Sequence, residues 1–134
     1  MKRQTGVTLI ELITVMTIIA ILSSIAIPSY LSYVVRTQRS AAKACLSEYA
    51  QLMERFYTTN LTYVGATPSP GCRTDGGLDQ RYTFDIGTPT QKTYTATATP
   101  TGTQATKDAK CGSLTLTQDG TRGVSGTAGV AACW

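Results

Sequence analysis

The hydrophobic pattern of the first part of the chain predicts one long helix with two different halves. From Val7 to about Val35 the residues are uncharged and mostly apolar, apart from Glu11. Farther along, apolar side chains recur at intervals of three, four or seven, which places them in one stripe of a helix; the stripe consists of Leu31, Val35, Ala42, Leu46, Tyr49, Met53 and Phe56. We therefore predict a helix over residues 8–57, with a kink at Pro28.

Alternation of polar and apolar residues replaces the helical period in the second half of the chain. Such alternation, rich in Thr, Tyr and Ile, predicts half-buried antiparallel strands over residues 82–86, 93–99 and 113–117. Asp119-Gly120 is a strong hairpin turn, so residues 121–125 are expected to return as a short strand. The Gly-rich residues 126–132 have little propensity of their own. The predicted fold class is α+β, with the long helix packed on a three- to four-stranded antiparallel sheet.

Glu11 needs an explanation, because a charge inside a bilayer costs about 2.5–3.5 kcal/mol on translocon-insertion scales. The apolar run is long enough to span a membrane, for which about 20 residues suffice. A cleavable secretory signal would use Lys2 and Arg3 and a cut near residues 24–26, but Glu11 is out of place in its apolar centre. A plain anchor helix does not account for Gly6 directly before the run. A buried core helix of this length does not suit so small a domain.

The stretch Gly6-Val-Thr-Leu-Ile-Glu11, after a short basic leader, resembles the processing site of type IV prepilins. The likeness continues through residues 18–22 and 25–28, and through Tyr30 and Tyr33. This resemblance favours a prepilin-type segment over the signal, anchor and core-helix interpretations.

The resemblance implies that a membrane-embedded prepilin peptidase cuts between Gly6 and Val7, and that Val7 is then N-methylated. It also implies that Glu11 acts in assembly. The chain departs from the family pattern at Val7, where Phe is usual, and at Ala20, where Gly is usual. Ala strengthens a helix by roughly 0.5–1 kcal/mol relative to Gly, so any local melting of this helix depends more on Pro28.

A division of the chain follows from the same resemblance. Residues 1–6 would be the leader peptide that is removed, and residues 7–30 the transmembrane and assembly half of the helix. Residues 31–134 would form a periplasmic or extracellular pilin-like domain with a C-terminal disulfide loop over 111–133.

Later segments resemble the PilE-type minor pilins; they are residues 53–60, 62–63, 94–100, 111–116 and 133–134. The predicted function is a structural subunit of a type IV pilus, a minor pilin incorporated into or priming the filament, in adhesion, twitching motility or DNA uptake. A major pilin, a type II secretion pseudopilin, and a DNA- or surface-binding tip pilin are the alternatives. The expected partners are other pilin subunits, the prepilin peptidase and the inner membrane before assembly, and the expected final location is the extracellular pilus of a Gram-negative bacterium.

The chain has four cysteines, Cys45, Cys72, Cys111 and Cys133, and no CxxC motif. An even number in an exported domain indicates two disulfides, and spacing alone permits three pairings. The resemblance implies that Cys111 pairs with Cys133 in a C-terminal loop, the D-region, and that Cys45 pairs with Cys72. Cys111 and Cys133 also argue against a major pseudopilin, which commonly binds calcium in that loop and lacks the disulfide.

The chemistry of the remaining side chains gives no support for an enzyme. The sequence contains no His, which excludes Ser-His and Cys-His catalytic arrangements. The absence of both His and CxxC motifs argues against zinc sites with paired spacing. The Asp and Glu residues show no pairing that the sequence can single out. We therefore expect no catalytic residue, no metal and no cofactor.

The net charge of +4 includes Lys2 and Arg3, so it is weak support for an anionic partner. Arg36, Arg39 and Lys43 share roughly one helical face, which is expected to be solvated or to meet lipid headgroups, with inter-subunit charge pairing as the alternative. If the chain binds DNA, the better candidates lie in the globular part; they are Lys92, Lys107, Lys110 and Arg122.

Overall fold

The computed structural model describes residues 6–134, and the basic leader residues Lys2 and Arg3 lie outside the described part. The chain forms two compact units, one ending at Val34 and the other comprising Val35–Trp134. The long helix α1 (Leu9–Asn60) contributes to both units. Its bounds agree closely with the predicted helix over residues 8–57.

The first unit consists of the apolar half of α1. The Thr8 hydroxyl oxygen accepts a hydrogen bond from the Glu11 backbone N–H at 3.4 Å, so Thr8 caps the helix at its first turn. The helix is continuous through Pro28, and the predicted kink there stays a prediction. The most apolar stretch of the helix is not buried within the chain, and the helix is long and apolar enough to cross a membrane.

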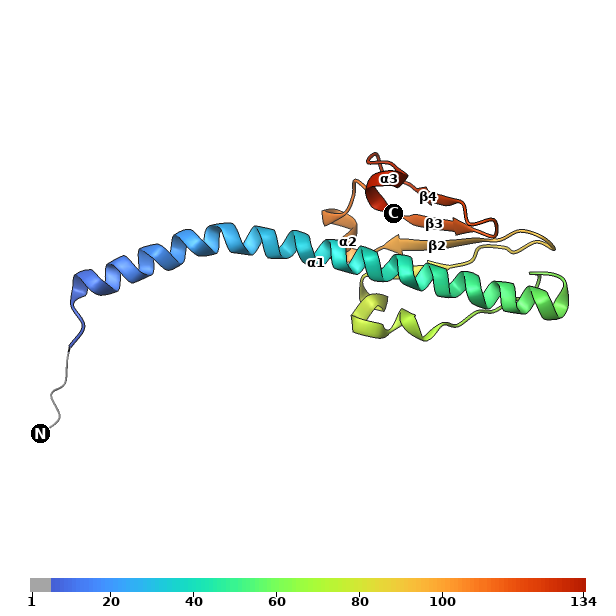
Figure 1. Ribbon diagram of the computed structural model, residues 1–134, viewed down its shortest axis with the longest axis horizontal. Coiled ribbons are helices and arrows are strands. Elements are labelled where there is room, and N and C mark those ends of the chain that lie inside the picture. The colour runs from blue at the N-terminus through green and yellow to red at the C-terminus, as the bar shows by residue number, and fades with distance from the viewer. Residues whose placement is uncertain (1–5) are drawn as a thin grey trace, which may run out of the picture. The chain divides into compact units, whose positions relative to one another are not determined.

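The second unit contains a four-stranded antiparallel sheet in which sequential strands are neighbours (Figure 1). Its strands are β1 (Tyr82–Asp85), β2 (Thr95–Pro100), β3 (Leu114–Thr117) and β4 (Arg122–Val124). The register pairs Tyr82 with Pro100, Thr95 with Thr117, and Leu114 with Val124. The predicted α+β meander is therefore confirmed, and β1 and β4 form the edges of the sheet.

The core of the second unit lies between the amphipathic half of α1 and one face of the sheet. Helix α1 buries Ala42, Cys45, Leu46, Tyr49 and Met53, and the strands bury Tyr82, Ala96, Ala98, Leu114 and Leu116. The Tyr49 ring stacks on the Phe84 ring of β1 at 5.7 Å between centroids. From Ala42 to Met53 the predicted helical stripe packs on the period-2 face of the strands, whereas Leu31, its first member, is exposed.

Short helices occupy the connections, which the sequence pattern left as loops or tail. They are the 3₁₀-helices η1 (Gly71–Arg73) and η2 (Asp75–Gln80), and the α-helices α2 (Gly102–Lys107) and α3 (Val130–Cys133). Each is too short to show an apolar period, so the pattern could not reveal it. The tail, which has little propensity of its own, forms α3, where Trp134 N–H donates to the Val130 oxygen at 2.8 Å.

Candidate functional site

Glu11 stands in the first turn of α1, four residues after Val7 of the predicted processing site. Its side chain is exposed, and no other charged residue occurs between residues 6 and 35. Thr8 and Glu11 have the spacing of a capping box, and a carboxylate near a helix N-terminus is favourable. Glu11 therefore has a local structural use, from which any role in assembly must be separated.

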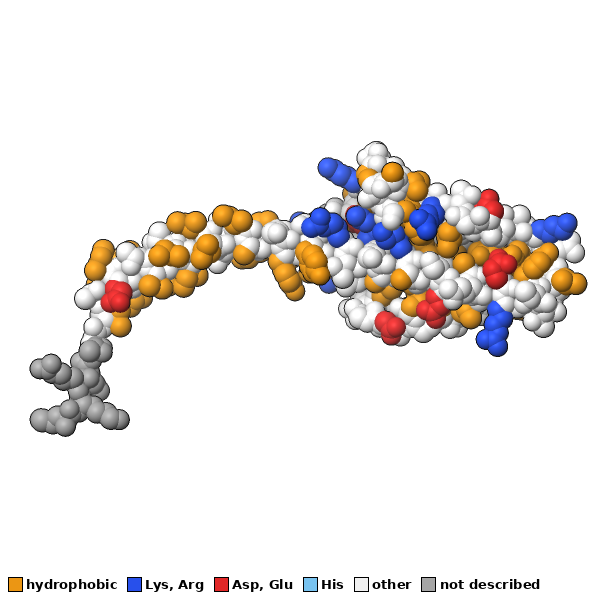
Figure 2. Space-filling view, in the orientation of Figure 1, with side chains coloured by type: hydrophobic (Ala, Val, Ile, Leu, Met, Phe, Trp, Pro, Cys, Tyr) orange, Lys and Arg blue, Asp and Glu red, His pale blue; other side chains and the backbone are white. Residues whose placement is uncertain are grey.

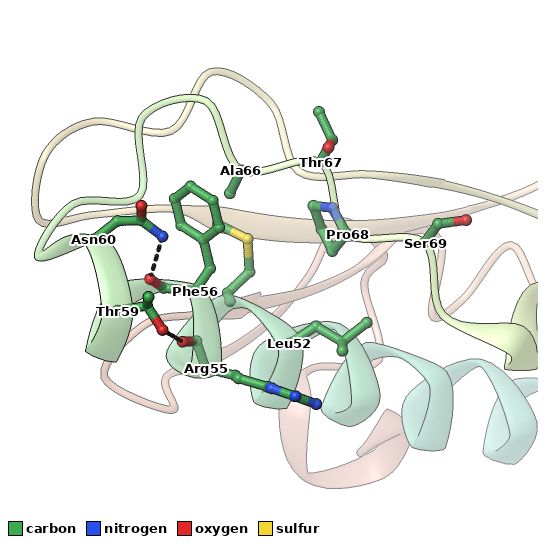
Figure 3. A pocket seen from close by; sticks show the side chains of 10 residues that line it. Leu52, Arg55, Phe56, Thr59, Asn60, Ala66, Thr67, Pro68 and Ser69 are labelled. Atoms are coloured by element: carbon green, nitrogen blue, oxygen red, sulfur yellow. Dashed lines mark hydrogen bonds between the residues drawn. The ribbon is translucent and has the colours of Figure 1, made fainter.

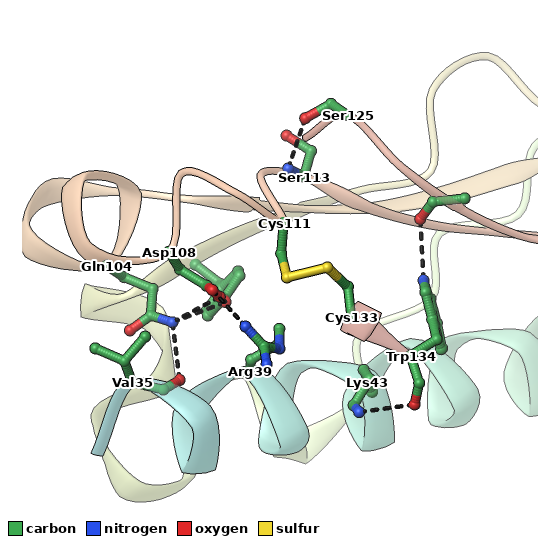
Figure 4. Close-up of a disulfide and its surroundings, with 12 residues drawn as sticks. Val35, Arg39, Lys43, Gln104, Asp108, Cys111, Ser113, Ser125, Cys133 and Trp134 are labelled. Carbon is green, nitrogen blue, oxygen red and sulfur yellow. Dashed lines mark hydrogen bonds and ion pairs between the residues drawn. A yellow bond between two sulfur atoms is a disulfide. The ribbon is translucent and has the colours of Figure 1, made fainter. Parts of the chain in front are cut away.

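The two disulfides join Cys45 with Cys72 and Cys111 with Cys133, which is the pairing that the family resemblance implies. The first ties η1 to α1 across 27 residues of chain, and the second ties α3 to the segment before β3 across 22 residues (Figure 4). Closing loops of this length stabilises a fold by about 2–4 kcal/mol, mainly by restricting the unfolded chain.

Close backbone contact completes the C-terminal loop. The backbone N–H groups of Gly126 and Ala128 donate to the oxygens of Cys111 and Lys110 at 3.0 and 2.9 Å. A Cβ atom on residue 126 would collide with the Lys110 backbone oxygen, so only Gly allows this approach. Gly126 is thus a packing requirement of the loop.

Trp134 is half-buried and held from several sides. Its indole Nε1–H donates to the Gly123 oxygen of β4 at 3.0 Å, and Lys43 Nζ of α1 donates to the Trp134 backbone oxygen at 3.0 Å (Figure 4). The guanidinium carbon of Arg122 lies 5.2 Å from the centroid of the Trp134 ring. Trp134 therefore joins α1 to the outer strand of the sheet, through its backbone oxygen and its indole N–H respectively, and its ring lies under Arg122.

A buried polar cluster fastens α2 to α1 and β1. Asp108, 4% exposed, forms an ion pair with Arg39, and it accepts hydrogen bonds from the Tyr82 hydroxyl and the Gln104 Nε2, each at 3.3 Å (Figure 4). Gln104 Nε2 also lies 3.0 Å from the Val35 oxygen of α1. Burial raises the pKa of Tyr82 to about 12, so its hydroxyl keeps the proton that it donates.

The expectation for the basic face of the helix is wrong at two of its three positions. Arg39 and Lys43 are half-buried, because they bind Asp108 and the Trp134 backbone oxygen within the same chain. Only Arg36 is exposed. The partners lie 69 and 91 residues away along the chain, so no local signal in the sequence could have identified them.

The candidate residues Lys107, Lys110 and Arg122 are all exposed on the C-terminal half of the domain. Lys107 is the last residue of α2, Lys110 lies between α2 and Cys111, and Arg122 opens the edge strand β4. Figure 2 shows basic side chains gathered on this face around the C-terminus, between α2 and β4. We call Lys107, Lys110 and Arg122 the basic strip.

Lys92 lies apart from α2, at the other end of the sheet. It precedes β2, whose first residue pairs with the last residue of β3, and the neighbouring Tyr94 N–H donates to Gln118 in the β3–β4 turn at 3.3 Å. Lys107 and Lys110 follow the opposite end of β2. The four candidates are therefore distributed along the sheet and do not converge at one point.

Comparison with known proteins decides the family. A family model described as type IV minor pilin ComP, DNA uptake sequence receptor, matches residues 28–115. A second model, the prokaryotic N-terminal methylation motif, matches residues 1–27.

This chain belongs to the ComP family of type IV minor pilins. The minor pilin is thus a structural subunit of a pilus and not an enzyme, and it assembles with other pilin subunits. Its methylation motif and its apolar helix fit anchoring in a membrane before entry into the pilus. Family membership also decides against the alternatives of a major pilin and a secretion pseudopilin.

Solved structures of pilins share the fold of this minor pilin. The non-core minor pilin PilV of Neisseria meningitidis is similar with a TM-score of 0.54 and 24% identity, over 72% of this chain and 91% of that chain. A type IV pilin from Shewanella oneidensis is similar with a TM-score of 0.51 and 27% identity, over 75% of this chain and 97% of that chain.

A groove of about 430 Å³ lies between the end of α1 and the extended segment after it (Figure 3). Its floor is apolar, with Phe56 facing Ala66 and Pro68, and Arg55 lies at its margin. Asn60 Nδ2 is occupied, because it donates to the Phe56 oxygen at 2.9 Å. Among residues 6–134, no group of three His, Cys, Asp or Glu side chains could hold a metal ion, here or elsewhere.

Proposed function

We propose that this minor pilin binds double-stranded DNA through the basic strip, with Lys92 as a further contact at the other end of the sheet. The description of the matched family as a DNA uptake sequence receptor motivates the proposal. Exposed Lys and Arg side chains bind the phosphate backbone and release its counterions, which supplies most of the affinity of such proteins.

The observation that carries this proposal is that the cations of the basic strip are unpaired in the described part of the chain, whereas the acidic residue beside them is neutralised. Asp108, the carboxylate between Lys107 and Lys110, is buried and already neutralised by Arg39. Within residues 6–134, Lys107, Lys110 and Arg122 take part in no ion pair. The face around α2 and the C-terminal loop is therefore left with a surplus of positive charge, although the chain as a whole carries little.

Neutralising two of these charges tests the proposal. We expect Lys107→Gln/Lys110→Gln to weaken binding of a duplex and to reduce the slope of log affinity against log salt by about 2, since each phosphate contact contributes about 0.9. Fluorescence anisotropy of the full chain in detergent micelles, over about 50–200 mM salt, measures both quantities.

Arg55→Gln is the matched control, because Arg55 is an exposed cation at the far end of α1, beside the groove. It should change neither the affinity nor the slope by more than a small fraction of the double variant's effect. If Arg55→Gln weakens duplex binding as much as the double variant does, the chain binds DNA by diffuse electrostatic attraction and not through the basic strip. No binding of wild-type chain to any duplex at low salt would overturn the proposal and favour a surface-binding role.

We further propose the route by which the subunit reaches the filament. A prepilin peptidase in the inner membrane removes residues 1–6, and residues 7–30 hold the subunit in that membrane until it joins an extracellular pilus of a Gram-negative bacterium. Residues 31–134 then form the exposed domain. The match of residues 1–27 to the methylation motif supports this route.

Mass spectrometry of the subunit purified from membranes tests the processing. We expect a mass that corresponds to residues 7–134 with one added methyl group, because cleavage after Gly6 exposes the Val7 amine for methylation. In a strain without prepilin peptidase the mass should correspond to an N-terminus at Met1. An N-terminus at Met1 or Ile27 in the strain that has the peptidase would contradict the proposed route.

A further inference from the structure

We propose that Arg122, whose guanidinium lies over the Trp134 ring, reads a guanine in the major groove of duplex DNA and so contributes base specificity. This inference rests on the proposed DNA binding, and it assigns Arg122 a different role from the phosphate contacts of Lys107 and Lys110. Three features of the structure carry it: a fixed platform, a free guanidinium edge and a position on the outer strand.

The platform is the Trp134 ring, which cannot turn freely. The bond from its Nε1–H to the Gly123 oxygen fixes the indole edge against β4, and the bond from Lys43 fixes the backbone of the same residue. The disulfide between Cys133 and Cys111 holds the preceding residue. Together these contacts present one defined ring surface to Arg122.

Contact with the Trp134 ring orders the Arg122 side chain while leaving its hydrogen-bond donors available. The guanidinium is planar, and its attraction to an aromatic ring acts through its face, whereas its N–H donors lie in its plane. Among the described residues, the Arg122 guanidinium has no hydrogen bond or ion pair. A fork that is already oriented loses less entropy on binding, and it matches two acceptors in one plane, such as O6 and N7 of guanine.

The position of Arg122 suits entry into a groove. β3 and β4 form a hairpin, β4 is an edge strand, and Arg122 is the first residue of β4 after the turn. β3 is also paired with β2, so the exposed edge of β4 and the turn before it are the parts that can approach the groove. A bidentate bond from Arg to guanine is the commonest specific contact in the major groove.

The charge at the turn favours a base edge over a phosphate as the partner of Arg122. Asp119 accepts hydrogen bonds from the Thr117 hydroxyl and from the Thr121 N–H, which hold its carboxylate in the turn. The bond from Thr117 lowers the pKa of Asp119, and the negative charge of this carboxylate in the turn disfavours a phosphate as the partner of Arg122. The acidic residue in the segment of Lys107 and Lys110 is Asp108, and Arg39 neutralises its carboxylate. These two amines therefore have no free carboxylate beside them in their own segment.

The test combines a protein variant that keeps the charge at position 122 with a DNA duplex that lacks one acceptor atom of a guanine. Wild-type full-length chain in detergent micelles first selects duplexes from a pool with a randomised centre. Each guanine of a selected duplex is then replaced in turn by 7-deazaguanine, which lacks the N7 acceptor. We expect one such replacement to weaken wild-type binding about tenfold, the effect of losing a good base contact.

Arg122→Lys should bind the normal duplex about tenfold more weakly than wild type does, and should lose nothing further when that guanine is replaced, because the same contact is already missing. It should bind the unselected pool nearly as well as wild type, since the charge remains. Trp134→Leu should behave in the same way, with thermal unfolding used to confirm that the domain is folded. Lys110→Gln should weaken all duplexes equally.

The outcomes separate this inference from the proposed function. If wild-type chain binds no duplex, the DNA-binding proposal fails, and the assignment of Arg122 fails with it. If wild type binds and Arg122→Lys keeps the full discrimination between guanine and 7-deazaguanine, only the assignment of Arg122 is overturned. Discrimination that survives in Trp134→Leu would refute the role of the platform.

Discussion

A Glu11→Gln subunit will fold and insert into the membrane, but it will be missing from sheared pili. We expect its amount in filaments to fall at least about tenfold, which corresponds to a loss of about 1.4 kcal/mol or more in assembly free energy. Immunoblots of sheared pili and of membranes, with the wild-type copy absent, measure the two pools separately.

The physical reason is the isolation of this charge. Glu11 is the only charged residue between residues 6 and 35, and the globular unit begins after it, at Val35. A carboxylate in an apolar environment gains much from an opposite charge, because the attraction is weakly screened there. The family resemblance suggests the α-amino group of an adjacent subunit, at Val7 in a like chain, and such a pair would set the stagger between neighbouring helices.

Local helix capping is the competing explanation, and matched variants separate the two. Gln at position 11 can still serve in a capping box with Thr8, so Glu11→Gln removes the charge and leaves the cap. Thr8→Ala removes the cap that the structure shows and leaves the charge, at a cost of about 1 kcal/mol in helix stability. Filament incorporation that survives Glu11→Gln but not Thr8→Ala would show that capping is what matters.

The fold could be predicted because the sequence shows two clear patterns, a helical repeat of apolar residues and an alternation typical of strands. The helical stripe ends in a polar segment, 58–60, and the strands alternate over several residues around the Asp119-Gly120 turn, so α1 and the sheet follow from local pattern. The short helices could not be predicted, because four to six residues without an apolar period resemble a loop. They are held by bonds to distant segments.

The candidate site could be predicted by residue type but not by arrangement. Lys107, Lys110 and Arg122 were identifiable as cations of the globular part, whereas their distribution along the sheet depends on strand register. Arg39 and Lys43 were misassigned to a solvated face, because their partners Asp108 and Trp134 are distant in sequence. Charge counts alone do not distinguish a cation that binds an internal group from one that is available to a ligand.

Asp108→Ala will destabilise the globular unit by about 3 kcal/mol or more, the usual result of removing one partner of a buried ion pair. The change leaves the Arg39 guanidinium, 15% exposed in its side chain, without its counter-charge, and it deprives the Tyr82 hydroxyl and Gln104 of an acceptor. Since these bonds hold α2 against α1, the ordering of Lys107 and Lys110 should be lost before the sheet unfolds.

Chemical unfolding of the full chain, followed by circular dichroism, measures the loss, and duplex binding at low denaturant reports on the strip. Lys107→Ala, on the same short helix but exposed, should alter stability by no more than about 0.5 kcal/mol. Arg39→Leu combined with Asp108→Ala should cost less than the two single changes added together, because neither charge is then left alone in the interior. Additive losses, or an Asp108→Ala variant within about 1 kcal/mol of wild type, would show that α2 is held by the Cys111–Cys133 loop instead of by the ion pair.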